Sequence, residues 1–338
     1  MTLDNKSLEW LLEEDTTLPS ARYLALRDLF DRPATDPELA AAAESIMRTG
    51  PVPAILRAQS PEGNWAKPGT GYSPKYRGTL WSVLILAELG AAPDEPRIRK
   101  ACEYVLDHAI ASNDAFSCNA KPVPSGAILC LNGNLLFAMI RLGLWDDLRV
   151  RAVAEWLAGA ILGEGLVHYY ESGTSGAGFA CGINLKQPCG WGANKALRGL
   201  LAIPQQDRTS EITRALDAGA GFLLSRNPAE ADYPYIKRVS STWFKLGFPL
   251  SYWSDVLETA ANLVDLGLGV DPRVQPALDW VESKRDLEGR WKLENSLNGK
   301  MWTDIERRGK PSKMVSLRVL RALKRAGRLA MPPRPIVP

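Results

Sequence analysis

The stretch LAELGAAPDEPRIRKACEYVL, residues 86–106, decides the fold, because its pattern returns along the chain. An apolar segment ends at Leu-Gly, a short polar link follows, and an amphipathic segment begins. Close copies are MIRLGLWDDLRVRAVAEWL (139–157) and LVDLGLGVDPRVQPALDWV (263–281), and looser copies occupy 26–47 and 200–224. Apolar residues recur at helical spacing on both sides of each link, and the links carry residues that favour helix N-termini. Each copy therefore predicts a helical hairpin.

The hairpins predict an all-α protein, a single (α/α)6 toroid in which six inner helices surround a central cavity and six outer helices pack behind them. We expect this domain to span residues 1–330, with an extended proline-rich tail at 331–338. The inner helices are expected at about 20–31, 78–90, 130–143, 189–203, 253–267 and 312–325. The outer helices are expected at about 37–48, 97–109, 148–161, 209–225 and 273–285, with 6–14 completing the sixth pair.

Composition narrows the class of protein. Of 338 residues, 46% are hydrophobic and 23% charged, which is enough apolar material for a large core. The net charge of +3 gives no sign of a nucleic-acid surface. No apolar run is long enough to span a membrane, and the acidic N-terminus does not resemble an export signal, so a cytoplasmic protein is expected.

A second pattern follows the outer segments. Gln59, Gly63 and Trp65 read Q-x3-G-x-W, and Arg285, Gly289 and Trp291 repeat it with Arg for Gln. Glycine permits a tight turn, and the tryptophan is expected to pack against the end of a neighbouring helix. The pattern predicts structural staples between hairpins.

These motifs resemble the QW repeat of squalene cyclases and their relatives, the terpene cyclase and prenyltransferase superfamily. The phrases CLNGNLL, CGWGANKAL, FKLGFPLSYWSD and GKPSKMVSLRVLRALK look like a bacterial squalene cyclase-like group without an assigned reaction. The resemblance implies an α/α toroid and a small apolar or prenyl-type substrate. It fixes no reaction, because a fold alone does not determine function.

The loops that precede the inner helices are rich in aromatic, cationic, Asn and Cys residues, next to Gly and Pro. Functional residues often lie on such loops, and helix N-termini favour anions. The toroid that the resemblance implies builds the mouth of its cavity from these loops, so we expect the mouth at the N-terminal ends of the inner helices. The residues expected to bind substrate there are Lys75, Tyr76, Arg77, Asn132, Asn134, Trp191, Lys195, Tyr252, Trp253, Lys310 and Lys313.

Four cysteines also belong to these loops. Cys118 and Cys130 precede one inner helix, and Cys181 and Cys189 precede the next. If the four thiolates converge, they bind Zn²⁺ tetrahedrally. Neither pair has C-x-x-C spacing, so packing of small buried side chains and reactive thiols remain alternatives.

The acid motifs of terpene cyclases, D-x-D-D and D-D-x-x-D, are absent, and so is the D-x-C zinc motif of protein prenyltransferases. Asp255 is the best replacement acid, because it follows Ser-Tyr-Trp at the start of an inner helix, where aromatic walls can stabilise carbocations. The alternative is that Asp255 caps the helix. His168 is the second candidate catalytic residue.

Three functions follow. The first is a terpene cyclase-like enzyme that acts on an isoprenoid or similar apolar substrate by acid and electrostatic catalysis. The second is a toroid whose cysteines bind zinc, for structure or for chemistry. The third is a non-enzymatic interaction scaffold.

Overall fold

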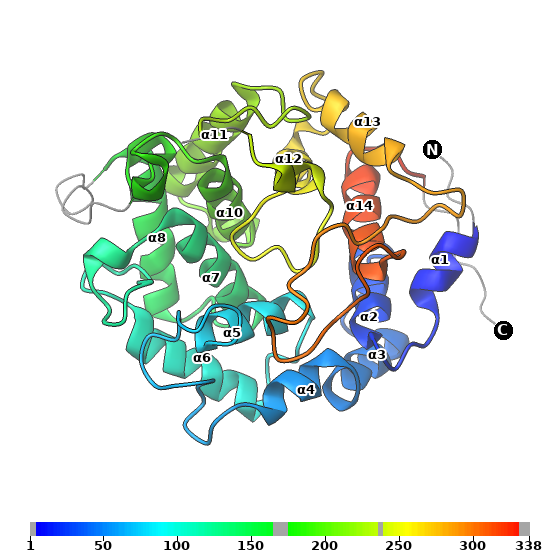
Figure 1. Ribbon diagram of the computed structural model, residues 1–338, viewed down its shortest axis with the longest axis horizontal. Helices are drawn as coiled ribbons and strands as arrows, with labels where there is room; N and C mark the ends of the chain where they lie inside the picture. The colour runs from blue at the N-terminus through cyan, green and yellow to red at the C-terminus, as the bar shows by residue number, and fades with distance from the viewer. Residues whose placement is uncertain (1–4, 165–174, 236–238, 331–338) are drawn as a thin grey trace.

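The computed structural model describes residues 5–164, 175–235 and 239–330, and it shows a ring of α-helices (Figure 1). Within these residues the only strand-like pairing is a few isolated bridges between loops. The predicted all-α toroid is therefore confirmed. No described helix has the length and apolar character that crossing a membrane requires.

The inner helices follow one another around the ring, and the last packs against the first. They are α2 (Pro19–Asp28), α5 (Thr79–Glu88), α7 (Leu129–Arg141), α10 (Gly190–Leu201), α12 (Val256–Leu263) and α14 (Lys313–Arg325). Contacts join α5 to α7, α7 to α10, α10 to α12, α12 to α14, and α14 to α2. Six of the expected inner segments thus become neighbours around one centre.

The outer helices lie behind them. They are α3 (Pro37–Arg48), α6 (Pro96–Ala109), α8 (Leu148–Leu162), α11 (Ser210–Leu224), α13 (Gln275–Ser283) and α1 (Asn5–Leu12). The boundaries fall close to the expected ones because the links supply side-chain caps: Asp36, Asp147, Thr209 and Ser312 each accept a backbone N–H of the following turn.

Two features differ from the expectation. A short helix, α4 (Pro51–Arg57), follows α3, where no helix was expected. The inner segment expected at 253–267 begins later, at α12, and ends in a π-helical turn, Val264–Leu268, with Gly267 at a positive φ of 83°. Residues 251–255 form a loop instead, because Asp255 caps the helix.

The closest approach in the ring is between α7 and α10. A Cβ at Gly133 would lie 2.1 Å from the Lys195 carbonyl oxygen, and one at Gly199 would lie 2.6 Å from the Gly133 carbonyl oxygen. Only glycine permits this contact. It fixes Lys195 and Arg198 of α10 at the centre of the ring.

Trp65 and Trp291 occupy equivalent places after α4 and α13. Each indole is fully buried, and each Nε1–H donates to a carbonyl ten residues earlier, Ile55 and Val281, at 2.8 Å. Gly63 has a positive φ of 102° and lies against the backbone of Lys100 in α6. These contacts attach the turn to the neighbouring hairpin.

Candidate functional site

A cavity of about 400 Å³ lies inside the ring, and all six inner helices line it. None of the outer helices contributes a lining residue. The apolar part of its wall consists of Leu24, Ala87, Phe137, Leu201, Ala202, Phe248, Leu250, Ala261, Met314 and Leu317. Phe248, Leu250 and Met314 are buried, so part of the cavity wall is an apolar surface removed from solvent.

The lining residues of α2, α5, α7 and α10 lie in the C-terminal halves of these helices, whereas α12 and α14 line the cavity along most of their length. This corrects the expected position of the mouth at the N-terminal ends of the inner helices. There, the loops 244–255 and 291–312 cross the middle of the ring, in yellow and orange (Figure 1). Phe248 and Leu250, from the first of these loops, form part of the cavity wall.

Arginines dominate the charge of the cavity. Its lining contains seven arginines and four carboxylates, a net formal charge of +3. We call the outer group the arginine rim, and it consists of Arg27, Arg141, Arg208, Arg321 and Arg325 with Asp28 and Asp265.

Ion pairs neutralise only part of the rim. Asp265 accepts from Arg321 at 2.8 Å and from Arg325 at 2.7 Å, and Asp28 accepts from Arg27. Arg208 donates only to backbone carbonyls, and Arg141 is exposed; neither forms an ion pair with a carboxylate of the described residues. The rim therefore holds guanidinium groups that are free to bind an anion.

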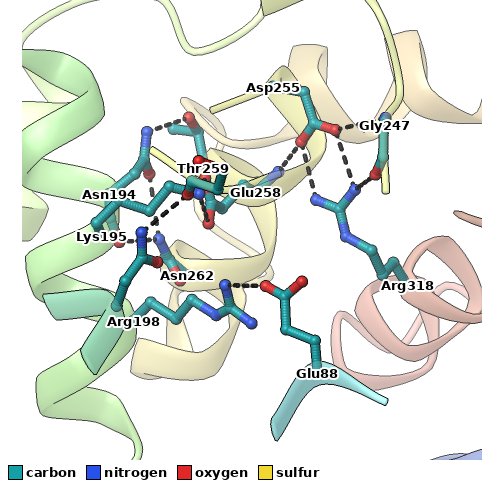
Figure 2. A network of polar contacts seen from close by, with 12 residues as sticks. Glu88, Asn194, Lys195, Arg198, Gly247, Asp255, Glu258, Thr259, Asn262 and Arg318 are labelled. Carbon is teal, nitrogen blue, oxygen red and sulfur yellow. Dashed lines mark hydrogen bonds and ion pairs between the residues drawn. The ribbon is translucent and has the colours of Figure 1, made fainter. Parts of the chain in front are cut away.

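Beneath the rim, three ion pairs form what we call the charged floor (Figure 2). Its members are Glu88, Lys195, Arg198, Asp255, Glu258 and Arg318. Lys195 Nζ donates to both oxygens of Glu258, at 2.6 and 2.8 Å. Burial lowers the pKa of Lys195, and the facing carboxylate opposes that shift. The three cations and three anions balance, so the excess positive charge belongs to the rim.

Asp255 is fully buried, and donors occupy both oxygens of its carboxylate. The backbone N–H of Glu258 donates to Oδ1 at 2.8 Å, and that of Gly247 donates to Oδ2 at 3.2 Å. Arg318 adds a bidentate ion pair, with both distances 3.0 Å. The residue thus caps α12 and ties the loop 244–255 to α14, and a protonated oxygen would lose one of these contacts. The geometry matches the helix-cap alternative, and Asp255 is absent from the cavity lining.

Aromatic side chains fill the ring at the N-terminal ends of the inner helices. We call them the aromatic cluster: Tyr72, Tyr76, Trp81, Trp191, Tyr252 and Trp253. Their ring centres lie 5.2 to 6.4 Å apart. The hollow beside them, lined by Asn134 and Cys130 among others, has a volume of about 10 Å³, roughly one water molecule.

None of the residues expected to bind substrate lines the central cavity. Lys195 does not line the cavity itself, but it pairs with Glu258, which does. Asn132 bonds to the backbone of Phe116 and Ile128, and Asn134 donates to the Ser251 carbonyl. Tyr76, Trp191, Tyr252 and Trp253 belong to the aromatic cluster.

The remaining cations of that set lie on the face formed by the loops. Lys75 Nζ lies 5.0 Å from the ring centre of Tyr252, and Arg77 Nε donates to the Met301 carbonyl. Lys313 pairs with Glu13 and Asp15 near the N-terminus, and Lys310 is exposed. Lys75, Arg77 and Lys313 thus each have a different partner, and Lys313 is buried.

The four cysteines do not form a metal site. Among the described residues, no group of three or more His, Cys, Asp or Glu side chains is arranged to hold a metal ion. Cys181 and Cys189 interact with each other, and the hydrogen bond from Cys189 lowers the pKa of Cys181 to about 6. Burial raises the pKa of Cys130 to about 12. The arrangement of the four cysteines thus does not match the zinc alternative, and it includes a pair of interacting thiols. His168 lies outside the described residues.

Sequence reasoning missed the arginine rim. Arg27, Arg141 and Arg325 of the rim each lie in the last turn of an inner helix, and so does Arg198 of the charged floor. The recurrence of a cation at that position is a signal in the sequence. A cation there also stabilises its own helix through the dipole, so the recurrence alone does not identify a site.

No family model matches the chain, and no protein of curated function matches it. Among solved structures, it is similar to a variant of the type II terpene cyclase MstE from Scytonema without ligand, at 14% identity and a TM-score of 0.31, covering 81% of this chain and 94% of that one. A crystal structure of a protein from Actinoplanes matches at 15% identity and a TM-score of 0.30, covering 82% and 97%. A second MstE variant, in complex with its substrate geranylgeranyl dihydroxybenzoate, matches at 14% identity and a TM-score of 0.31, covering 82% and 96%.

Proposed function

We propose that the central cavity binds a small apolar or prenyl-type molecule with an anionic head group, and that the protein acts on it as a terpene cyclase-like enzyme. The volume of about 400 Å³ lies within the range of small-molecule sites, about 300–1,000 Å³. The apolar side chains of its wall suit a hydrocarbon body.

The observation that carries the proposal is the excess of positive charge at the rim. A cationic, partly enclosed surface favours an anion, and guanidinium groups bind phosphate or carboxylate oxygens bidentately. An amphiphilic anion would place its head among Arg27, Arg141 and Arg208 and its chain against Phe248 and Leu250. A neutral hydrocarbon would leave the rim without a partner.

The same arrangement supports electrostatic catalysis. If the head group is a diphosphate that leaves as an anion, the rim stabilises the charge that develops on it. Phe137 carries the Arg198 guanidinium against its ring at 3.8 Å, which holds one of the cations of the cavity in place. Catalysis by proton donation from Asp255 has less support, because four contacts occupy its carboxylate.

Farnesyl diphosphate is the probe that tests this function. Isothermal titration calorimetry would compare it with farnesol and with inorganic diphosphate, which represent its two halves. We expect farnesyl diphosphate to bind most tightly, and its affinity to fall as salt rises, since the rim interaction is electrostatic. Gas chromatography of an organic extract then detects a hydrocarbon or alcohol product.

Two results separate binding from catalysis. Equal affinity for farnesol and farnesyl diphosphate would contradict the role of the rim and overturn the proposal. Tight binding of farnesyl diphosphate without any product would retain the cavity as a ligand site and reject the enzyme.

A further inference from the structure

Glu88 has an oxygen that nothing in the described structure binds. Its Oε1 accepts from Arg198 Nη1 at 2.7 Å, and the side chain is only 5% exposed. Its Oε2 is buried and has no hydrogen-bond partner, although the residue lines the central cavity. Figure 2 shows Glu88 between Arg198 and Arg318.

This oxygen is unusual within the charged floor. Both oxygens of Glu258 accept from Lys195, and both oxygens of Asp255 accept from Arg318. Glu88 Oε2 is thus the single carboxylate oxygen of the floor without a donor. Most buried polar groups have a partner, so a donor is expected from outside the described protein atoms.

We propose that Glu88 Oε2 accepts a hydrogen bond from the ligand of the central cavity, which therefore carries a hydroxyl or ammonium group as well as an anionic head. This inference rests on the proposed function and narrows its substrate class. The rim recognises the anion, the floor recognises the donor, and the apolar wall contacts the chain between them.

The neighbouring cations do not supply that donor. Lys195 and Arg318 act on Glu88 only through their charge, because their hydrogen bonds go to Glu258, Asp255 and the Gly247 carbonyl. The Gly133–Gly199 contact and the ion pairs hold these groups in place. Oε2 is closed to a water-sized probe, so the Glu88 side chain must turn slightly toward the cavity for a ligand donor to reach this oxygen, and no hydrogen bond of Oε2 has to break.

The test compares matched ligands on the unaltered protein. Geranyl and farnesyl diphosphate would each be titrated in three forms: unmodified, with a hydroxyl group on the terminal carbon, and with a methoxy group there. Two chain lengths are needed because the hydroxyl must reach the floor while the diphosphate stays at the rim. The methoxy form keeps the oxygen but removes the donor.

At one of the two lengths we expect the hydroxyl form to bind about ten-fold more tightly than the methoxy form, the size expected for one hydrogen bond to a charged acceptor. Glu88→Met should reduce this ratio to about one while the unmodified diphosphate still binds. Glu294→Met is the matched control, because Glu294 pairs with Lys284 outside the cavity, and it should keep the ratio.

The outcomes separate the two proposals. Equal binding of the hydroxyl and methoxy forms at both lengths, with the parent diphosphates bound, overturns the role of Glu88 alone and indicates that water satisfies Oε2. Persistence of the preference in Glu88→Met also overturns it. Failure of every diphosphate to bind overturns the proposed function, and this inference with it.

Discussion

The two ends of the inner helices differ in what they present to the centre of the ring. At the N-terminal ends, aromatic rings pack into a cluster that leaves space for about one water molecule. At the C-terminal ends, arginines surround a cavity of about 400 Å³. The aromatic residues that the sequence suggested for catalysis or binding thus pack against one another. The arginines that line the cavity are residues that also occur at the ends of ordinary helices.

The largest expected effect concerns the floor between these ends. Lys195→Met leaves the carboxylate of Glu258 buried without its cation, so the free energy of unfolding should fall by about 3–5 kcal/mol. Urea or guanidinium denaturation measures it. The double variant Lys195→Met with Glu258→Leu should recover most of the loss, since an apolar pair leaves no uncompensated charge. A loss below about 1 kcal/mol in the single variant would show that the floor tolerates an unpaired carboxylate.

The next effect tests whether the aromatic cluster is structural. Trp81 is 3% exposed, and its Nε1–H donates to the Tyr72 carbonyl at 2.7 Å. Trp81→Ala should reduce the free energy of unfolding by about 3 kcal/mol, as expected for a buried aromatic side chain. Calorimetry on the folded variant should find the affinity for farnesyl diphosphate unchanged. If Trp81→Ala kept its stability but lost its affinity for farnesyl diphosphate, the binding site would lie at this end of the ring instead.

At the rim we expect the reverse: a substitution should change the affinity for the ligand and leave the free energy of unfolding nearly unchanged. Arg141→Ala should weaken binding of farnesyl diphosphate about ten-fold, the effect of one charge-assisted hydrogen bond. Its free energy of unfolding should change by less than about 0.5 kcal/mol, because Arg141 is exposed and forms no ion pair with the described carboxylates. Arg48→Ala, on the outer helix α3, is the matched control and should leave affinity unchanged.

The smallest effect distinguishes the cysteines at the N-terminal ends. The hydrogen bond from Cys189 lowers the pKa of Cys181 to about 6, so its thiolate should form as pH rises through that value. Alkylation of Cys181 by iodoacetamide, followed by mass spectrometry, should rise to half its maximum near pH 6. Burial raises the pKa of Cys102 to about 12, so that thiol should stay unmodified. Cys189→Ala should move the midpoint for Cys181 upward, and an unchanged midpoint would reject the thiol pair.

Sequence patterns predicted the fold well because they are local. The Leu-Gly links and their caps determine where helices begin and end, and Asp36, Asp147 and Thr209 cap the helices that follow the links. The helix α4 was missed because it is short and begins Pro-Val-Pro, a sequence that resembles a loop.

The candidate site was predicted poorly because long-range pairing creates it. Glu88 and Arg198 are 110 residues apart, and Lys195 and Glu258 are 63 apart. No local spacing links them. Lys195 was identified from its place beside the loop that enters α10, but its partner Glu258 was not. Asp255 was identified as a buried carboxylate near aromatic residues, yet only the packing of α14 against α12 reveals its ion pair with Arg318.

The ring closes where α14 packs against α2 and Lys313 pairs with Glu13. During biosynthesis it can therefore close only after α14 has been made. The ribosome releases α2 long before it synthesises α14. The apolar side of α2 that packs against α14 therefore stays uncovered until nearly the whole chain has been made. An open solenoid has terminal repeats with polar outer faces, whereas a ring has none. Deleting one hairpin would therefore expose the flanks of two helices at once, and shortened chains should depend on chaperones rather than form smaller rings.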